Sequence, residues 1–132
     1  MTLASDLNLQ QMLTRERHRI HLIGVAGSGM SGIAALLLEL GHDVSGSDKV
    51  KSWEVDRLQR LGLHFRAEHR AEDAKDAELV IYSSAIRETN PIRAAAALAG
   101  QPRHGVIDQS MAHRQCRGAH EVCIVIPSVG AA

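Results

Sequence analysis

Aromatic residues are nearly absent from this sequence, which has one Trp, one Tyr and one Phe among 132 residues. Its core must therefore be aliphatic, although a chain of this length can bury a core without disulfides or metals. Cysteine is also scarce. Cys116 and Cys123 do not form a C-x-x-C pair, so the sequence favours reduced thiols over a disulfide framework.

The sequence also has no excess of positive or negative charge and no long apolar run. Lys and Arg number 15, as do Asp and Glu, so no basic field indicates nucleic acid and no acidic tail indicates a basic partner. The apolar runs fall short of the roughly 20 residues that span a membrane. Residues 1–18 lack the apolar segment of a signal peptide. We therefore expect a soluble cytoplasmic protein without a membrane span.

Strand-like and helix-like segments alternate along the chain after a polar lead-in at 1–18. The expected strands are 20–25, 43–47, 63–66 and 79–82. The expected helices are 30–40, 52–61, a short one within 67–77, and 91–99 with Asn90 as its cap. This alternation predicts an α/β fold, a Rossmann-like doubly wound parallel sheet in a single domain. Residues 106–112 are expected to form a helix and 121–126 one more strand.

A glycine-rich turn at 24–32, Gly-Val-Ala-Gly-Ser-Gly-Met-Ser-Gly, is the most informative feature that is present. A predicted strand leads into it and a predicted helix leads out, an arrangement that presents backbone N–H groups to a phosphate. Gly27, Gly29 and Gly32 satisfy G-x-G-x-x-G. Asp48 follows Gly27 by about 20 residues, where an acidic residue binds a ribose hydroxyl in dinucleotide-binding folds. The alternatives are a turn that binds nothing and, for Asp48, an ordinary turn residue.

Two other loops could contribute to the same site. Ser83, Ser84 and Ala85 follow the fourth predicted strand, and open α/β sheets bind ligands outside the carboxyl ends of their strands. His69 follows the third predicted strand and can reach the same edge, with a solvated loop histidine as the alternative. Trp53 is expected to pack in the second helix.

The sequence predicts neither a metal site nor a catalytic group. Four residues near the C-terminus invite a zinc interpretation, but their spacing fits no common structural zinc pattern: His113, Cys116, His120 and Cys123. No Ser/His/Asp arrangement or pair of acids can be placed from spacing alone.

The segment 21–35 resembles the opening of the Mur ligases. The resemblance covers residues 19–102 and includes Gly-Met-Ser-Gly, Gly-Ser-Asp and Ser-Ser-Ala-Ile in that order, motifs far more specific than the glycine pattern alone. It implies a three-domain enzyme of peptidoglycan synthesis whose first domain holds UDP-N-acetylmuramate. A central P-loop domain would bind ATP and Mg²⁺, and a third would help bind L-alanine. The resemblance further implies an acyl phosphate of the muramyl carboxylate that the amine of L-alanine attacks.

The resemblance also implies roles for individual residues. The diphosphate of the substrate would be cradled by Gly27, Ser28, Gly29, Met30 and Ser31. The uridine and ribose side would be lined by Asp48, His69, Ser83, Ser84, Ala85 and Ile86. No cofactor is expected in this chain itself.

The sequence departs from the family pattern after residue 102. The family continues into Gly-Thr-His-Gly-Lys-Thr, whereas here Pro-Ser-Val-Gly-Ala-Ala at 127–132 follows the last strand-like run, and G-K-[ST] occurs nowhere. We therefore expect a lead-in at 1–18, a UDP-binding domain at 19–102 and a divergent segment at 103–132. The family's ATP-binding domain would be absent and the chain alone inactive. An NAD-binding domain of an oxidoreductase and a non-catalytic interaction module remain as alternatives.

Overall fold

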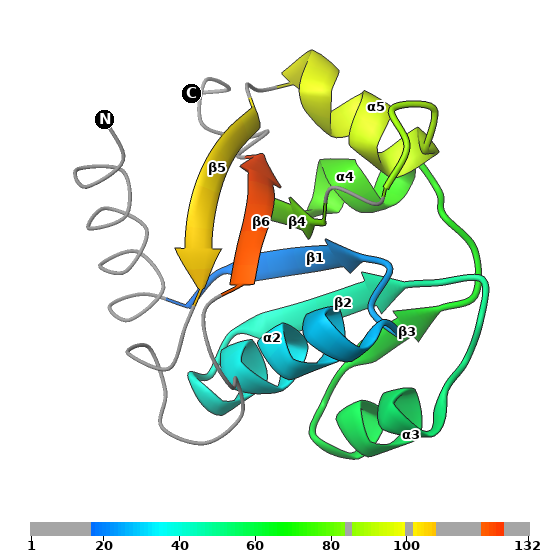
Figure 1. The fold of residues 1–132 in the computed structure, drawn as a ribbon, viewed down its shortest axis with the longest axis vertical. Helices are drawn as coiled ribbons and strands as arrows, with labels where there is room; N and C mark the ends of the chain where they lie inside the picture. The colour runs from blue at the N-terminus through cyan, green and yellow to red at the C-terminus, as the bar shows by residue number, and fades with distance from the viewer. Residues whose placement is uncertain (1–16, 84–85, 100–101, 108–119, 126–132) are drawn as a thin grey trace.

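The computed structural model describes residues 17–83, 86–99, 102–107 and 120–125, and all structural statements concern these residues (Figure 1). The strands are β1 (Arg19–Ile23), β2 (Asp43–Ser47), β3 (His64–Arg66), β4 (Leu79–Tyr82), β5 (Pro102–Ile107) and β6 (His120–Val125). The helices are α2 (Ser28–Glu39), α3 (Trp53–Arg60), α4 (Glu72–Asp76) and α5 (Pro91–Ala99). Each strand and helix expected between residues 19 and 99 is confirmed, with shifts of one or two residues at most ends.

The strands form one sheet in the order β3-β2-β1-β4-β6-β5. The first four are parallel, with Ile20 opposite both Val44 and Leu79. The predicted parallel, doubly wound α/β sheet is therefore confirmed for β1 to β4. The order in which strands are added to the sheet reverses between β1 and β4, because β2 and β3 lie on one side of β1 and β4 lies on the other. Such a switch point is where ligands bind in open α/β sheets.

The C-terminal part corrects one expectation. Val106 and Ile107, assigned from the sequence to a helix at 106–112, belong to strand β5, and 108–112 lie outside the described residues. β5 pairs antiparallel with β6, and β6 pairs antiparallel with β4. Strand pairing satisfies the backbone N–H and C=O groups of β5 that face β6, which outweighs the weak helical pattern of the stretch.

Alternate strand residues face two separate cores. Ile20, Leu22 and Val44 belong to the core on the side of α2 and α3. Ile23 and Tyr82 belong to the core on the side of α4 and α5. Figure 1 shows the two helix pairs on opposite sides of the sheet. Since successive strand residues point to opposite faces, one short parallel strand can supply both layers.

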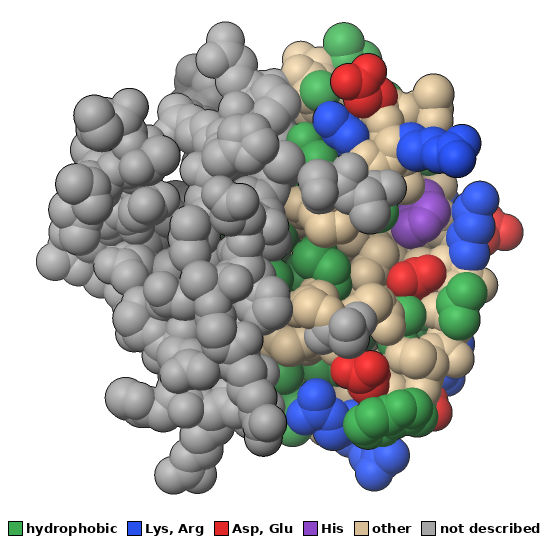
Figure 2. Space-filling view, in the orientation of Figure 1, with side chains coloured by type: hydrophobic (Ala, Val, Ile, Leu, Met, Phe, Trp, Pro, Cys, Tyr) green, Lys and Arg blue, Asp and Glu red, His purple; other side chains and the backbone are tan. Residues whose placement is uncertain are grey.

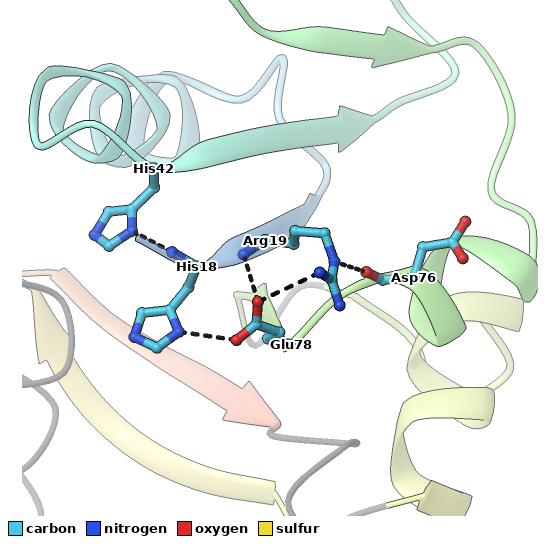
Figure 3. Close-up of polar contacts among 5 residues, drawn as sticks. All are labelled: His18, Arg19, His42, Asp76 and Glu78. Carbon is cyan, nitrogen blue, oxygen red and sulfur yellow. Dashed lines mark hydrogen bonds and ion pairs between the residues drawn. The ribbon is translucent and has the colours of Figure 1, made fainter. Parts of the chain in front are cut away.

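The amino ends of three strands are joined by a polar cluster (Figure 3). The backbone N–H of His18 donates to Nδ1 of His42 at 3.0 Å, and the ring of His18 bonds Glu78 at 3.0 Å. Glu78 also accepts from the backbone N–H of Arg19, whose side chain donates to the carbonyl of Asp76. The hydrogen bond from His18 lowers the pKa of the Glu78 carboxyl below its ordinary value. The cluster ties β1 to the segments that start β2 and β4.

Two observations concern the surface. Within the described ranges, no helix has the length and apolar character needed to cross a membrane. The expectation that Trp53 packs in its helix is wrong, because its side chain is 73% exposed at the start of α3. Position 53 lies in the first turn, outside the stripe of Val55 and Leu58 that contacts the core.

Candidate functional site

The glycine-rich turn between β1 and α2 is held on the end of β2. The backbone N–H groups of Gly24 and Val25 both donate to the carbonyl of Ser47, at 2.8 and 3.2 Å. Gly27 then donates to the carbonyl of Gly24 at 3.2 Å, which closes the turn. Gly24 has a φ of +79°, a conformation that side chains with a Cβ rarely adopt. The turn therefore has one defined geometry, set by its own glycines and by β2.

Gly46 permits the close approach of the turn to β2. A Cβ on Gly46 would lie 2.6 Å from Cβ of Val25, with both methyl groups of that valine nearly as close. Because Val25 is fully buried, it has no room to move aside. Glycine at position 46 thus belongs to the architecture of the turn although it lies outside the G-x-G-x-x-G pattern.

The turn leads directly into the first turn of α2. Gly27 is the N-cap residue, and Ser28, Gly29 and Met30 follow as the first helical residues. The first N–H groups of any α-helix have no partner within the helix, and they carry partial positive charge. No acidic residue lies in this first turn to neutralise that charge. The backbone here is suited to an anion such as a phosphate.

Ser31 is placed differently from its neighbours. Its backbone N–H donates to the carbonyl of Gly27 at 2.8 Å as part of the helix. Its side chain is buried, and its hydroxyl donates to Glu54 of α3. The serine joins α2 to α3, so its predicted contact with a diphosphate would need this hydroxyl to change partner.

Asp48, the predicted ribose ligand, braces the same turn from the end of β2. One carboxylate oxygen accepts from the backbone N–H of Ala26 at 3.0 Å, and the other accepts from that of Val50 at 3.1 Å. Ser52 adds a further link, since its hydroxyl lies 3.4 Å from the carbonyl of Ala26. The arrangement agrees with the alternative interpretation of Asp48 as a turn residue, while a half-buried carboxylate beside the site can still accept a ligand hydroxyl.

An open cavity of ≈ 520 Å³ lies at the same edge of the sheet. Its walls come from the loops after β2, β3 and β4: Lys49, Ala67, Glu68, His69, Ile86, Arg87, Thr89, Asn90 and Pro91. Figure 2 shows a histidine among Lys and Arg side chains on the side where β1, β2 and β3 end in Figure 1. Two of the predicted uridine-side residues, His69 and Ile86, therefore line one cavity.

The loop after β4 connects this cavity to the glycine turn. Ile86 reaches the glycine turn, because its Cδ1 is 3.2 Å from where a Cβ on Gly24 would be. The carbonyl of Ser83 accepts from the N–H of Ile86 at 3.1 Å, so Ser83 forms the base of that loop. Ser84 and Ala85 lie outside the described residues, as does the side chain of Ser28.

Helix α5 fixes the loop that carries Ile86. The side chain of Asn90 accepts from the backbone N–H groups of Ile92 and Arg93 at 2.9 and 3.3 Å, which confirms it as the cap. Arg93 donates to the carbonyl of Ile86 and lies over the ring of Tyr82, 4.9 Å from its centroid. One cap and one arginine thus connect the helix to the cavity wall and to the end of β4.

A row of polar side chains leads from His69 in the cavity wall into the sheet, and it was not predicted from the sequence. The ring of His21 bonds the hydroxyl of Ser45 through Nδ1 at 2.8 Å and the hydroxyl of Ser47 through Nε2 at 3.0 Å. The Ser47 hydroxyl also bonds Nδ1 of His69 at 2.8 Å. Residues 45 and 47 alternate with Val44 and Gly46 along β2, so the period-two pattern could have indicated a polar inner face.

Burial dominates the electrostatics of this row. Desolvation lowers the pKa of His21 to about 4, and the charges of Arg66 and His69 act in the same direction against the opposing effect of Asp73. Asp73 is buried on α4 and pairs with Arg66 at 2.8 Å, although its second oxygen has no partner among the described residues. His21 is therefore neutral at pH 7.

The residues of this chain do not fit a site for ATP and Mg²⁺. The sequence has no G-K-[ST], and the glycine turn contains no lysine to meet a terminal phosphate. In the part of the chain that the structure describes, no group of three or more His, Cys, Asp or Glu residues could hold a metal ion. No step of ATP chemistry is derived from these residues.

Comparison with known families gives a match over most of the chain. The model of the family described as "Mur ligase family, catalytic domain" matches residues 19–114. A curated UDP-N-acetylmuramate–L-alanine ligase of Desulfatibacillum aliphaticivorans is 49% identical over 88 residues, which is 67% of this chain and 19% of that protein. The ligase of the same name from Desulfotalea psychrophila is 51% identical over 77 residues, 58% of this chain and 17% of that protein.

Solved structures give the same result. A UDP-N-acetylmuramate–alanine ligase of Thermotoga maritima matches with a TM-score of 0.58 and 33% identity, over 62% of this chain and 19% of that one. A UDP-N-acetylmuramate:L-alanyl-gamma-D-glutamyl-meso-diaminopimelate ligase of Neisseria meningitides matches with a TM-score of 0.53 and 29% identity, over 63% and 27%. The chain spans less than a fifth of the length of the curated relatives it matches.

Proposed function

Because this chain belongs to the Mur ligase family, we propose that it is the substrate-holding part of a UDP-N-acetylmuramate–L-alanine ligase of peptidoglycan synthesis. The observation that carries the proposal is the position of the glycine turn. It lies at the carboxyl end of β1, beside β4 at the switch point of the sheet, and the cavity opens next to it. The names of the similar ligases supply the substrate, UDP-N-acetylmuramate.

The proposed roles follow the two parts of the site. The segment from Gly27 to Ser31 receives the diphosphate, with the backbone N–H groups of Ser28, Gly29 and Met30 as the donors, since those of Gly27 and Ser31 already bond carbonyls of the turn. The uridine enters the cavity beside His69 and Ile86, which line it. Asp48, Ser83, Ser84 and Ala85 complete the uridine and ribose side in this proposal. The chain's own contribution is to bind and orient the substrate.

In this proposal, the ligation reaction itself takes place on parts of the enzyme that this chain does not contain. In the proposed parent, ATP and Mg²⁺ convert the muramyl carboxylate to an acyl phosphate, which the amine of L-alanine then attacks. Neither nucleic acid nor a membrane takes part, and the reaction belongs to the cytoplasm. Since the residues present do not fit ATP, we propose that the chain alone binds UDP compounds and catalyses no ligation.

Calorimetric titration of the full chain with UDP-N-acetylmuramate, UDP and NAD⁺ tests the proposal. We expect the muramyl compound to bind, UDP to bind more weakly, and NAD⁺ not to bind. A preference for NAD⁺ would select the oxidoreductase alternative. A folded chain that binds none of the three and forms a stable oligomer would select the interaction module.

Gly29→Val tests the placement of the diphosphate. A branched side chain in the first turn of α2 would occupy the space that a phosphate needs against the backbone, so we expect binding of UDP compounds to fall at least about tenfold. Glu39→Val is the matched control, because it puts the same side chain at an exposed position near the other end of the helix. Unchanged binding by a folded Gly29→Val chain would overturn the placement.

A further inference from the structure

The hydrogen bonds of the polar row, formed by His21, Ser45, Ser47 and His69, restrict which ring nitrogens can carry protons. A serine hydroxyl has a single hydrogen, and Oγ of Ser47 faces a ring nitrogen on each side, Nε2 of His21 and Nδ1 of His69. If the hydroxyl donates to one ring, it must accept from the other. Neutral His21 also carries only one ring proton, so both histidines must hold their protons on the same type of nitrogen, both on Nδ1 or both on Nε2.

Ser45 breaks the tie between these two arrangements. Its hydroxyl has two neighbours: Nδ1 of His21 at 2.8 Å, which can donate or accept, and the backbone carbonyl of Ile20 at 3.5 Å, which can only accept. Both contacts are satisfied together only when Ser45 donates to the carbonyl and accepts from Nδ1–H of His21. Nε2 of His21 then accepts from the Ser47 hydroxyl, and Ser47 accepts from Nδ1–H of His69. The direction of the whole row is thus set at the Ile20 carbonyl.

The far end of the row is the ring of His69, which lines the cavity. Its Nδ1 is used by Ser47, and among the described residues no partner is recorded for its Nε2. In the arrangement above that nitrogen has a lone pair and no hydrogen. A neutral His69 therefore offers an acceptor to a molecule in the cavity.

We propose that Ser45, His21 and Ser47 are positioning residues that hold the proton of His69 on Nδ1, so that its Nε2 selects ligands carrying a hydrogen-bond donor. For the uridine of a UDP compound, which rests on the function proposed above, that donor is the N3–H of the base or a ribose hydroxyl. Asp73 and Arg66, whose charges act on His21 in opposite directions, pair with each other at 2.8 Å. In a neutral ring, the hydrogen bonds then decide which nitrogen holds the proton.

Nitrogen NMR of the ligand-free full chain tests the row without reference to function. Long-range proton–nitrogen correlation at about pH 8, where an ordinary imidazole is neutral, distinguishes protonated from bare ring nitrogens. We expect His21 and His69 both to carry the proton on Nδ1. His64, whose side chain is 71% exposed and lies outside the row, is the internal control; its Nε2 is 3.5 Å from a carboxylate oxygen of Asp43, so its proton should favour Nε2. Protons on Nε2 of both rings, or on different nitrogens, would overturn the proposal.

Variants of the row give a second test. Ser47→Ala removes the acceptor for Nδ1–H, so the resonance pattern of His69 should move toward that of His64, whereas Ser47→Thr keeps a hydroxyl and should retain the wild-type pattern. Ser45→Ala, which leaves Ser47 in place, should change the resonance patterns of both His21 and His69. A His69 pattern that stays as in wild type in folded Ser45→Ala and Ser47→Ala chains would overturn the positioning role.

UDP analogues test the selection. The analogue that lacks the selected donor, among N3-methyl-UDP, 2′-deoxy-UDP and 3′-deoxy-UDP, should bind wild type about tenfold more weakly than UDP. The same analogue should lose nothing further in His69→Phe. Equal binding of all three analogues and UDP would overturn the selection. If UDP itself does not bind while the NMR pattern is as expected, the proposed function fails and the proton arrangement stands.

Discussion

His21 places a titratable ring in the interior of the sheet, so the free energy of unfolding should depend on pH through this group. Its pKa is lowered from 6.5 to about 4, so between these values the unfolded chain binds a proton that the folded chain does not. Stability from this group is complete above pH 6.5 and is lost as the pH falls toward 4. The loss amounts to about 3 kcal/mol.

Urea unfolding between pH 7 and pH 4 measures this effect. In His21→Gln, which cannot take up the proton in either state, the fall in the free energy of unfolding over that range should be about 3 kcal/mol smaller than in wild type. His64→Gln is the control, because it removes an exposed histidine and should keep the wild-type slope. Equal slopes for His21→Gln and wild type would show that burial does not hold this ring neutral.

Gly46 gives a second prediction at the residue scale. Gly46→Ala would force a Cβ to 2.6 Å from the side chain of Val25 and should destabilise the protein by about 1–3 kcal/mol. The double variant with Val25→Ala should recover part of that loss, because the clash disappears with the valine methyl groups. Denaturant unfolding of the four chains forms a double-mutant cycle. Simple additivity of the two single effects would contradict a steric origin.

Individual residue roles were only partly predictable from the sequence. The glycine turn, Asp48 and His69 could be brought to one edge because parallel strands end on the same side. For the row through His21 and Ser47, the alternation along β2 could have indicated a polar face, but histidine and serine on short strands carry no signal of which side chains they meet. The contact of buried Ser31 with Glu54 of α3 could not be predicted either, because it depends on how two helices pack.

Helix α5 carries a prediction at the scale of an element. Asn90→Ala removes the side chain that accepts the first two backbone N–H groups of the helix, and should cost about 1 kcal/mol of unfolding free energy. Asn90→Asp keeps the acceptor and should lie close to wild type. Thermal or urea unfolding compares them. If the alanine and aspartate variants both have the wild-type free energy of unfolding, the cap contributes nothing, and Arg93 is the contact from α5 that fixes the loop of Ile86.

Elements were predictable where their pattern is local. α2 and β4 follow from apolar spacing and from a continuous apolar run, and Gly41 and Gly62 adopt the positive φ values expected where helices end. β5 was assigned to a helix in part, because a strand with a remote antiparallel partner has no periodic signal in a six-residue window. Strand pairing across the sheet, rather than local preference, decides such segments.

At the scale of the whole molecule, the single tryptophan should report on surface rather than core. Because the side chain of Trp53 is 73% exposed, its fluorescence in the native protein should be quenched by acrylamide nearly as well as in the unfolded chain. Trp53→Ser should change the free energy of unfolding by less than roughly 0.5 kcal/mol, measured by circular dichroism. Strong protection from acrylamide that disappears on unfolding would place this side chain in a packed environment instead.

Ser47 belongs to both ends of the proposed site. Its carbonyl holds the N–H groups of the glycine turn, and its hydroxyl holds the ring of His69. A single residue on a buried strand therefore fixes both the glycine turn and the His69 ring, and with them the distance between the two. Under the proposed roles, the site fits only a nucleotide long enough to contact both the glycine turn and His69. A shorter nucleotide such as UMP can contact only one of them.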